Sequence, residues 1–165
     1  MSAFKAADVP RKLKSIADLP PLIVAFGPDR GLVTETARRI AALFDGSPDP
    51  FAVTKLDAAT VTSETGRLSD EARTVSMFGG KRLVWVRDGG GKNLSPALAP
   101  LMADPPSDAV VLVEAGDLRR GVGLRKEAEA ARAAIAIHCP ADTARALVRM
   151  LDEAAAALDL KVDDD

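Results

Sequence analysis

The sequence has only one cysteine and one histidine, and it lacks any long apolar run. The single cysteine, Cys139, excludes an intrachain disulfide and a thiolate metal cluster, and it fits a reducing compartment. The single histidine, His138, excludes a histidine-rich metal site. The two residues are neighbours on a predicted strand, where successive side chains point to opposite faces, so they cannot pair as nucleophile and base. No stretch reaches about 18 consecutive apolar residues, so no membrane-spanning helix is predicted.

A strong excess of charge of either sign is also lacking. The net charge is −2, which argues against non-specific nucleic-acid binding by the surface as a whole. Of the 165 residues, 47% are apolar and 28% are charged, as is typical of a soluble globular chain with room for one domain and the beginning of another. The only candidate for a secretory signal is interrupted by Pro20 and Pro21. We therefore expect a cytoplasmic protein that has no membrane partner.

Short apolar runs alternate with helical patterns along the chain. Such runs predict five strands, at Leu22–Phe26, Phe51–Leu56, Leu83–Val86, Ala109–Val113 and Ala134–Ile137. Apolar periodicity predicts the helices between them, with faces formed by Val33, Ala37, Ile40 and Phe44, by Leu94, Leu98, Leu101 and Met102, and over Val61–Val75 and Leu124–Arg132. A further short helix near the N-terminus is expected to break at Pro10. This alternation predicts an α/β fold in which helices flank a five-stranded, mostly parallel sheet.

The last part of the sequence departs from this alternation. Pro140 ends the fifth strand, and Asp142 is positioned to cap a long amphipathic helix over Thr143–Leu158. No strand follows that helix in the sequence. We therefore predict an α/β domain over residues 1–140 and, over residues 141–165, the first helix of a truncated helical domain.

A helix-to-strand segment in the middle of the chain carries two adjacent bulky side chains. An apolar stripe predicts the end of an amphipathic helix at Leu68, Ala72 and Val75. Gly79 and Gly80 would stop that helix, and Met77 and Phe78 lie just before them. Neighbours on a helix point about 100° apart, so we expect at least one of the two bulky side chains to face outward. The alternative is that both of them cap the core.

Two glycine-containing turns follow predicted strands, where a phosphate-binding loop would lie. With Gly27 as the first glycine of the pattern GxxxxGK[ST], the last three positions hold Leu32, Val33 and Thr34, and only the threonine matches. Arg30 could supply part of the missing charge, but an ordinary strand-to-helix turn is favoured. The second turn, Gly89–Asn93, fails the same pattern. Asp88 stands where an ATPase would carry a metal-binding acid, although alone it is more typical of a strand end.

A cluster of basic residues follows the fourth predicted strand. It consists of Arg119, Arg120, Arg125 and Lys126. A solvated surface is the ordinary interpretation, and contact with a neighbouring subunit or with DNA is the functional one. The sequence leaves both open.

Two segments together resemble a known family. The residues SDEARTVSMFGGKRLV (Ser69–Val84) and LRRGVGLRKEAEA (Leu118–Ala130) are similar to the N-terminal domain of the delta subunit of bacterial DNA polymerase III, the clamp-loader subunit that grips the sliding clamp. The resemblance extends from the strand at Leu22 to the beginning of the second domain. It implies an AAA+/RecA-like first domain with a degenerate nucleotide site, for which no cofactor, metal or catalytic residue is expected.

The resemblance also implies where the chain meets its partner. In that family an apolar pair, commonly Leu-Phe, enters a hydrophobic pocket on the sliding clamp (beta subunit), and Met77 and Phe78 occupy the matching positions. Methionine is flexible enough to fill a similar pocket. Burying two such side chains contributes ~1.5–3 kcal/mol each, against an association cost of roughly 4–15 kcal/mol. A rim must therefore contribute, and its candidates are Arg73, Thr74, Lys81 and Arg82.

The role that the resemblance implies is a non-catalytic clamp-loader subunit that helps to open the clamp ring for loading on primed DNA in replication. Its partners would be the sliding clamp, the other clamp-loader subunits and DNA within the assembled loader. The holoenzyme is a nucleotidyltransferase complex, but no catalysis by this chain is expected. The family's C-terminal collar domain is expected to be missing here.

Two other classes of function compete with this one. The first is an atypical P-loop nucleotide-binding ATPase or kinase. The second is a structural domain of an unrelated assembly, with the helix tip buried. Binding of Mg-ATP and exposure of Met77 and Phe78 distinguish the three.

Overall fold

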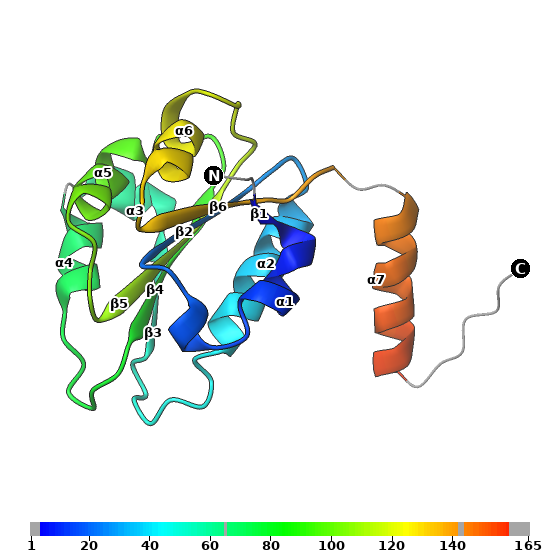
Figure 1. Ribbon diagram of the computed structural model, residues 1–165, viewed down its shortest axis with the longest axis horizontal. Coiled ribbons are helices and arrows are strands. Elements are labelled where there is room, and N and C mark those ends of the chain that lie inside the picture. Colours follow the sequence, from blue (N-terminus) through cyan, green and yellow to red (C-terminus); the bar gives the residue numbers. More distant parts are fainter. Residues whose placement is uncertain (1–3, 65, 142–143, 159–165) are drawn as a thin grey trace, which may run out of the picture.

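The computed structural model describes residues 4–64, 66–141 and 144–158. Its centre is a six-stranded sheet with the order β1-β6-β2-β5-β4-β3, in which every pairing is parallel (Figure 1). The strands are β1 (Phe4–Lys5), β2 (Leu22–Phe26), β3 (Val53–Asp57), β4 (Arg82–Gly89), β5 (Ala109–Ala115) and β6 (Ala134–His138). The five predicted strands and the α/β fold class are confirmed. The two-residue strand β1, which pairs with the end of β6, was not predicted.

Helices cover both faces of the sheet, because strand side chains alternate between two apolar clusters. Leu22, Val24 and Phe26 of β2 face one cluster and Ile23 faces the other. The first cluster is covered by α3 (Ala58–Ser63), α4 (Arg67–Arg73), α5 (Ser95–Ala103) and α6 (Gly123–Ala130), and the second by α1 (Val9–Lys12) and α2 (Arg30–Ala42). The sheet is therefore buried on both sides, as its continuous apolar strands require.

The helix α2 shows how local sequence produces one of these elements. The Asp29 carboxylate accepts a hydrogen bond from the Leu32 N–H at 3.0 Å and so caps the first turn. The predicted apolar face is confirmed, since Val33, Ala37, Ile40 and Phe44 are all buried. On the outer face, Glu35 and Arg39, which are four residues apart, form an ion pair at 3.4 Å.

Two helix predictions are wrong in detail. Pro10 does not break the N-terminal helix. It lies in the first turn of α1, where backbone N–H groups make no hydrogen bond within the helix, so the missing N–H of proline costs nothing. The predicted helix over Val61–Val75 is two helices, α3 and α4, separated at Gly66, which has a φ of 88°. α4 ends at Arg73, well before the glycines, and the Val75 side chain is 71% exposed.

The last helix, α7 (Ala144–Ala157), lies apart from the sheet (Figure 1). An ion pair of 3.8 Å joins its Glu153 to Arg39 of α2. Its exposed apolar side chains include Leu147, Val148, Met150 and Leu151. The predicted cap Asp142 is outside the described residues, and the division into residues 1–140 and 141–165 stays a prediction. None of the helices within the described ranges has the length and apolar character needed to cross a membrane.

Candidate functional site

The segment between α4 and β4 presents two large apolar side chains to solvent. Met77 is 95% exposed and Phe78 is 58% exposed. The expectation that at least one faces outward is confirmed for both, and the alternative that both cap the core is wrong. Gly79 and Gly80, with φ of 72° and 77°, turn the chain towards β4 in a backbone conformation that favours glycine. We call residues 74–81 the tip segment.

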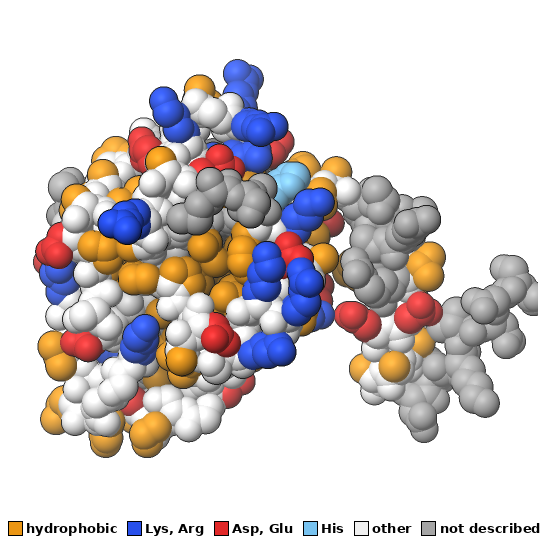
Figure 2. Space-filling view, viewed as in Figure 1, with side chains coloured by type: hydrophobic (Ala, Val, Ile, Leu, Met, Phe, Trp, Pro, Cys, Tyr) orange, Lys and Arg blue, Asp and Glu red, His pale blue; other side chains and the backbone are white. Residues whose placement is uncertain are grey.

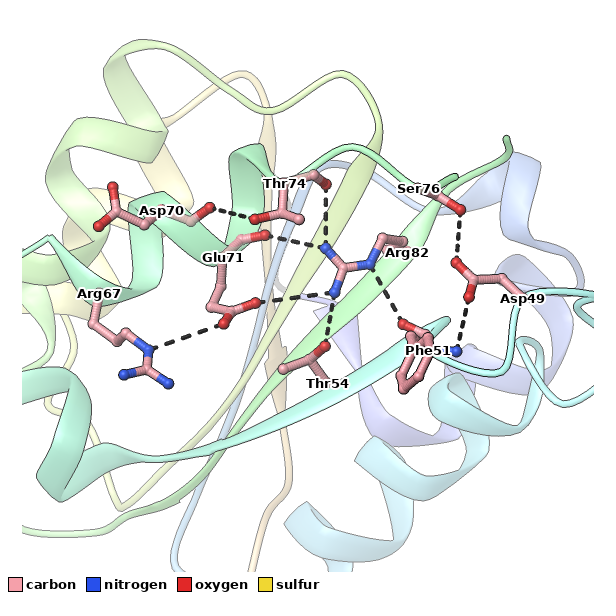
Figure 3. A network of polar contacts seen from close by, with 9 residues as sticks. All are labelled: Asp49, Phe51, Thr54, Arg67, Asp70, Glu71, Thr74, Ser76 and Arg82. Carbon is pink, nitrogen blue, oxygen red and sulfur yellow. Dashed lines mark hydrogen bonds and ion pairs between the residues drawn. The ribbon is translucent and has the colours of Figure 1, made fainter. Parts of the chain in front are cut away.

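Arg82, the first residue of β4, is hydrogen-bonded to the beginning of the tip segment (Figure 3). Its side chain is 8% exposed, and Nη1 donates to the carbonyl oxygens of Thr74 at 3.2 Å and Glu71 at 3.5 Å. Nη2 donates to Thr54 Oγ1 at 2.9 Å and lies 3.9 Å from Glu71 Oε2. Nε donates to the Phe51 carbonyl at 3.4 Å. One guanidinium thus connects the end of α4 to β3 and to the turn before it.

This burial corrects one of the rim assignments. Arg82 was a candidate for contact with a partner, but its donors are used inside the fold. The physical reason is that the last carbonyl groups of a helix have no partner within the helix and attract a cation. By binding the Thr74 carbonyl, Arg82 also explains why the chain leaves the helix before Val75.

The other rim candidates belong to the tip segment or lie directly before it. Arg73 is partly exposed and binds Asp104 at the end of α5, through the carbonyl at 3.0 Å and the carboxylate at 3.2 Å. Thr74 is exposed, and its Oγ1 donates to the Asp70 carbonyl at 2.9 Å. Lys81 is half-buried. Arg73 and Thr74 are therefore available beside Met77 and Phe78, although their part in binding stays a prediction.

A second set of hydrogen bonds to the tip segment is made by Asp49, a residue that no sequence pattern had indicated. Its Oδ2 accepts from Ser76 Oγ at 2.6 Å and its Oδ1 from the Phe51 N–H at 2.8 Å. Ser76 Oγ accepts in turn from the Phe78 N–H at 3.2 Å. The Ser76 hydroxyl and then the Phe51 N–H hold the pKa of Asp49 below its usual value, so this carboxylate is charged at neutral pH. No sequence signal joins residues so far apart in the chain.

A cavity of about 250 Å³ lies at the opposite edge of the sheet, where β2, β4 and β5 end. It is lined by Arg30, Val33, Thr34, Asp88, Gly89, Gly90, Glu114, Ala115 and Gly116. The fold thus brings Arg30 and Thr34, which follow the first glycine-containing turn, together with Asp88 at the end of β4. Such a crevice beside the strand where the chain order reverses is the usual ligand position in open α/β sheets. Val33, at the position of the missing lysine, packs in the core at 3% exposure.

His138 and Cys139 point to opposite faces of the sheet, as predicted. The His138 ring packs on Phe26 with 5.3 Å between ring centroids. The Cys139 thiol is buried at 3.7 Å from Thr36 Oγ1, and burial raises its pKa to about 11. The thiol is therefore protonated at neutral pH and a poor nucleophile.

The basic cluster after β5 divides into two parts. Arg125 is structural, since its guanidinium lies 4.7 Å from the Phe26 ring centroid, donates to the Leu118 carbonyl at 3.3 Å and pairs with Glu129 at 3.0 Å. The remaining residues of the basic cluster are exposed: Arg119, Arg120 and Lys126. Figure 2 shows Lys and Arg side chains gathered over α6 and its preceding loop. Contact of these residues with a subunit or DNA stays a prediction.

No family model matches this chain, and neither does any curated protein. Among solved structures, the chain is similar to a DNA clamp loader delta protein from Bacillus subtilis, with a TM-score of 0.68 and 19% identity over 92% of this chain and 47% of that one. It is also similar to a DNA polymerase III gamma subunit-related protein from Thermotoga maritima, with a TM-score of 0.50 and 12% identity over 80% of this chain and 44% of that one. The chain therefore spans less than half the length of either protein. At these identities the likeness establishes the fold alone, which is a parallel sheet with helices on both faces, as the sequence predicts.

Proposed function

Because the chain has the fold of a clamp-loader delta protein, we propose that it acts in a clamp loader as a non-catalytic subunit that binds the DNA polymerase sliding clamp. In this proposal the clamp's apolar pocket takes Met77 and Phe78, and binding helps to open the ring for loading on primed DNA. The observation that carries the proposal is the exposure of these two side chains, 95% and 58%, at the positions where the resemblance expects them. Other clamp-loader subunits, and DNA within the assembled loader, are the further partners, and the cytoplasm is the expected location.

Pre-organisation of the tip segment supports this role. Exposed apolar side chains on a loose loop would lose conformational freedom on binding, which weakens association. Here the carbonyl before Val75 is held by Arg82 and the hydroxyl before Met77 by Asp49. Much of that ordering is therefore complete before the partner arrives. Arg73 and Thr74 would supply polar contacts around the apolar pair.

We expect Met77→Ala/Phe78→Ala to lower affinity for the sliding clamp by about 30- to 150-fold, or roughly 2–3 kcal/mol, as is typical for the loss of central apolar anchors. Isothermal calorimetry with the purified clamp measures the change. Val122→Ala is the matched control, because Val122 is 57% exposed and follows β5, at the opposite edge of the sheet. Equal affinity of the double variant and the parent, with both folded by circular dichroism, would rule out this site.

Nucleotide binding is the second candidate function, and the cavity that unites Arg30, Thr34 and Asp88 favours it. Against it stand Leu32 and Val33, where a phosphate loop has glycine and lysine. We expect titration with Mg-ATP to give no micromolar binding, because the phosphates would meet Asp88 and Glu114 with only Arg30 to compensate. Micromolar binding that disappears in Arg30→Ala would favour the nucleotide-dependent function instead.

A further inference from the structure

Phe51 is another large apolar side chain that the fold presents to solvent, in addition to those of the tip segment. It is 71% exposed, compared with 58% for Phe78. The other phenylalanines are covered, since Phe26 and Phe44 are buried and Phe4 is half-buried. An exposed phenylalanine exposes apolar area to water at a cost, and several gathered together mark a contact surface. Within the residues that the structure describes, Phe51 and Phe78 are the two exposed phenylalanines.

Phe51 and Phe78 lie at the same edge of the sheet. Phe51 precedes β3 and Phe78 precedes β4, and these two strands are adjacent and parallel, with Val53 opposite Leu83. Residues before neighbouring parallel strands emerge at one edge. The Leu83 N–H also donates to the Ala52 carbonyl at 2.7 Å, which holds the starts of the strands together. Both side chains thus belong to the edge that carries the tip segment.

A chain of hydrogen bonds joins the two phenylalanines, and Figure 3 shows the part of it that runs from Phe51 through Asp49 to Ser76. It runs from the Phe51 N–H to Asp49 Oδ1, from Asp49 Oδ2 to the Ser76 hydroxyl, and from that oxygen to the Phe78 N–H, with lengths of 2.8, 2.6 and 3.2 Å. Asp49 is only 7% exposed, so this carboxylate is committed to the link. Arg82 makes a second link, because it binds the carbonyls of both Phe51 and Thr74. The spacing of the two turns is therefore fixed by the fold.

We propose that the turn Asp49–Phe51 is a second arm of the clamp-binding surface, with Phe51 entering an apolar site on the sliding clamp beside the one that takes Met77 and Phe78. The inference rests on the proposed function and adds a third anchor to it. Phe51 makes the contact, and Asp49 and Ser76 act as positioning residues that hold the arms at a constant separation. The sliding clamp is the occupant because this arm is continuous with the surface proposed to meet it. Burial of a third apolar side chain would also help to offset the free-energy cost of association, which two side chains alone do not offset.

We expect Phe51→Ala to weaken clamp binding about tenfold with an unchanged melting temperature, because the side chain removed makes few contacts in the free protein. Val122→Ala should bind like the parent. Ser76→Ala tests the positioning role, because it cuts the link without removing an anchor. In the Ser76→Ala protein, adding Phe51→Ala should lower clamp affinity only about twofold. If Ser76 had a purely structural effect, Phe51→Ala would still lower clamp affinity about tenfold.

The outcomes separate this inference from the function on which it rests. If Met77→Ala/Phe78→Ala loses clamp binding and Phe51→Ala does not, the second arm is wrong and the proposed function stands. If the parent chain does not bind the clamp, both fail. Analytical sedimentation tests whether Phe51 contacts a second copy of this chain instead of the clamp. A parent protein that is a dimer, and that Phe51→Ala converts to a monomer, would overturn the inference. Tenfold weakening by Phe51→Ala in a monomeric parent supports it.

Discussion

Arg82→Met is expected to lower the free energy of unfolding by roughly 3 kcal/mol or more. Methionine approximates the aliphatic part of the arginine side chain but has no donors. The change therefore leaves the carbonyls of Phe51 and Thr74 and the Thr54 hydroxyl without the partners they have now. Buried polar groups that lose their partners cost more than the hydrogen bonds were worth. Urea unfolding followed by circular dichroism measures the loss.

Two variants make this result specific. Arg73→Met removes a charge from the same helix-to-strand region, but Arg73 is partly exposed and pairs with an exposed Asp104, so less than about 1 kcal/mol is expected. Arg82→Lys keeps the charge with fewer donors and should fall between the two. If the network also positions the tip segment, Arg82→Lys weakens clamp binding while the protein is still folded. An Arg82→Met chain as stable as Arg73→Met would show that the network contributes little.

Gly27→Ala is expected to destabilise the protein by on the order of 3 kcal/mol or more, or to prevent soluble expression. An added Cβ would lie 1.9 Å from the Cys139 carbonyl oxygen, and the φ of 150° is one that other residues rarely adopt. Neither Gly27 nor Cys139 can easily move to relieve this clash, because a backbone hydrogen bond holds each of them. The Gly27 N–H donates to the Gly116 carbonyl at 3.2 Å, and the Cys139 N–H donates to the Phe26 carbonyl at 2.7 Å. The turn after β2 is thus held between the ends of β5 and β6.

Gly31→Ala is the matched control for this substitution. Gly31 lies in the first turn of α2, and its added Cβ would meet only Asp29 Oδ1, at 3.4 Å. Alanine is the better helix former, so a gain of up to about 1 kcal/mol is expected there. The buried Cys139 thiol supplies a second readout, because reaction with a disulfide reagent should accelerate only in Gly27→Ala. Similar stabilities for the two alanine variants would contradict the close packing described for this turn.

Most of the strands could be predicted because each is a short apolar run between turn residues. The strand β1 could not, because two residues carry no pattern and their pairing depends on the end of β6. The helix over Val61–Val75 was predicted too long because Val75 fits the helical period. Its actual end is set by Gly66 on one side and by Arg82, which is nine residues beyond α4, on the other.

The candidate site was predicted in part. Two adjacent bulky residues at a helix end indicated outward exposure, and Met77 and Phe78 are both exposed. Arg82 was misassigned because a charged residue beside a turn is usually solvated, and nothing local shows that it binds the carbonyls of Glu71, Thr74 and Phe51. Asp49, Ser76 and Phe51 were not recognised because their relationship is a set of contacts across the sheet edge.

The sequence by itself determined the α/β class, the order of the main strands and helices, and the poor match to a phosphate loop, because these depend on residue type and on spacing within one segment. The tertiary structure alone decided which charges are buried, which turns meet at one edge, and that Arg30, Thr34 and Asp88 line one cavity. The reason is physical. Periodicity reports the face of an element, whereas burial and hydrogen bonding depend on the neighbours that parallel strand pairing brings together from distant parts of the chain.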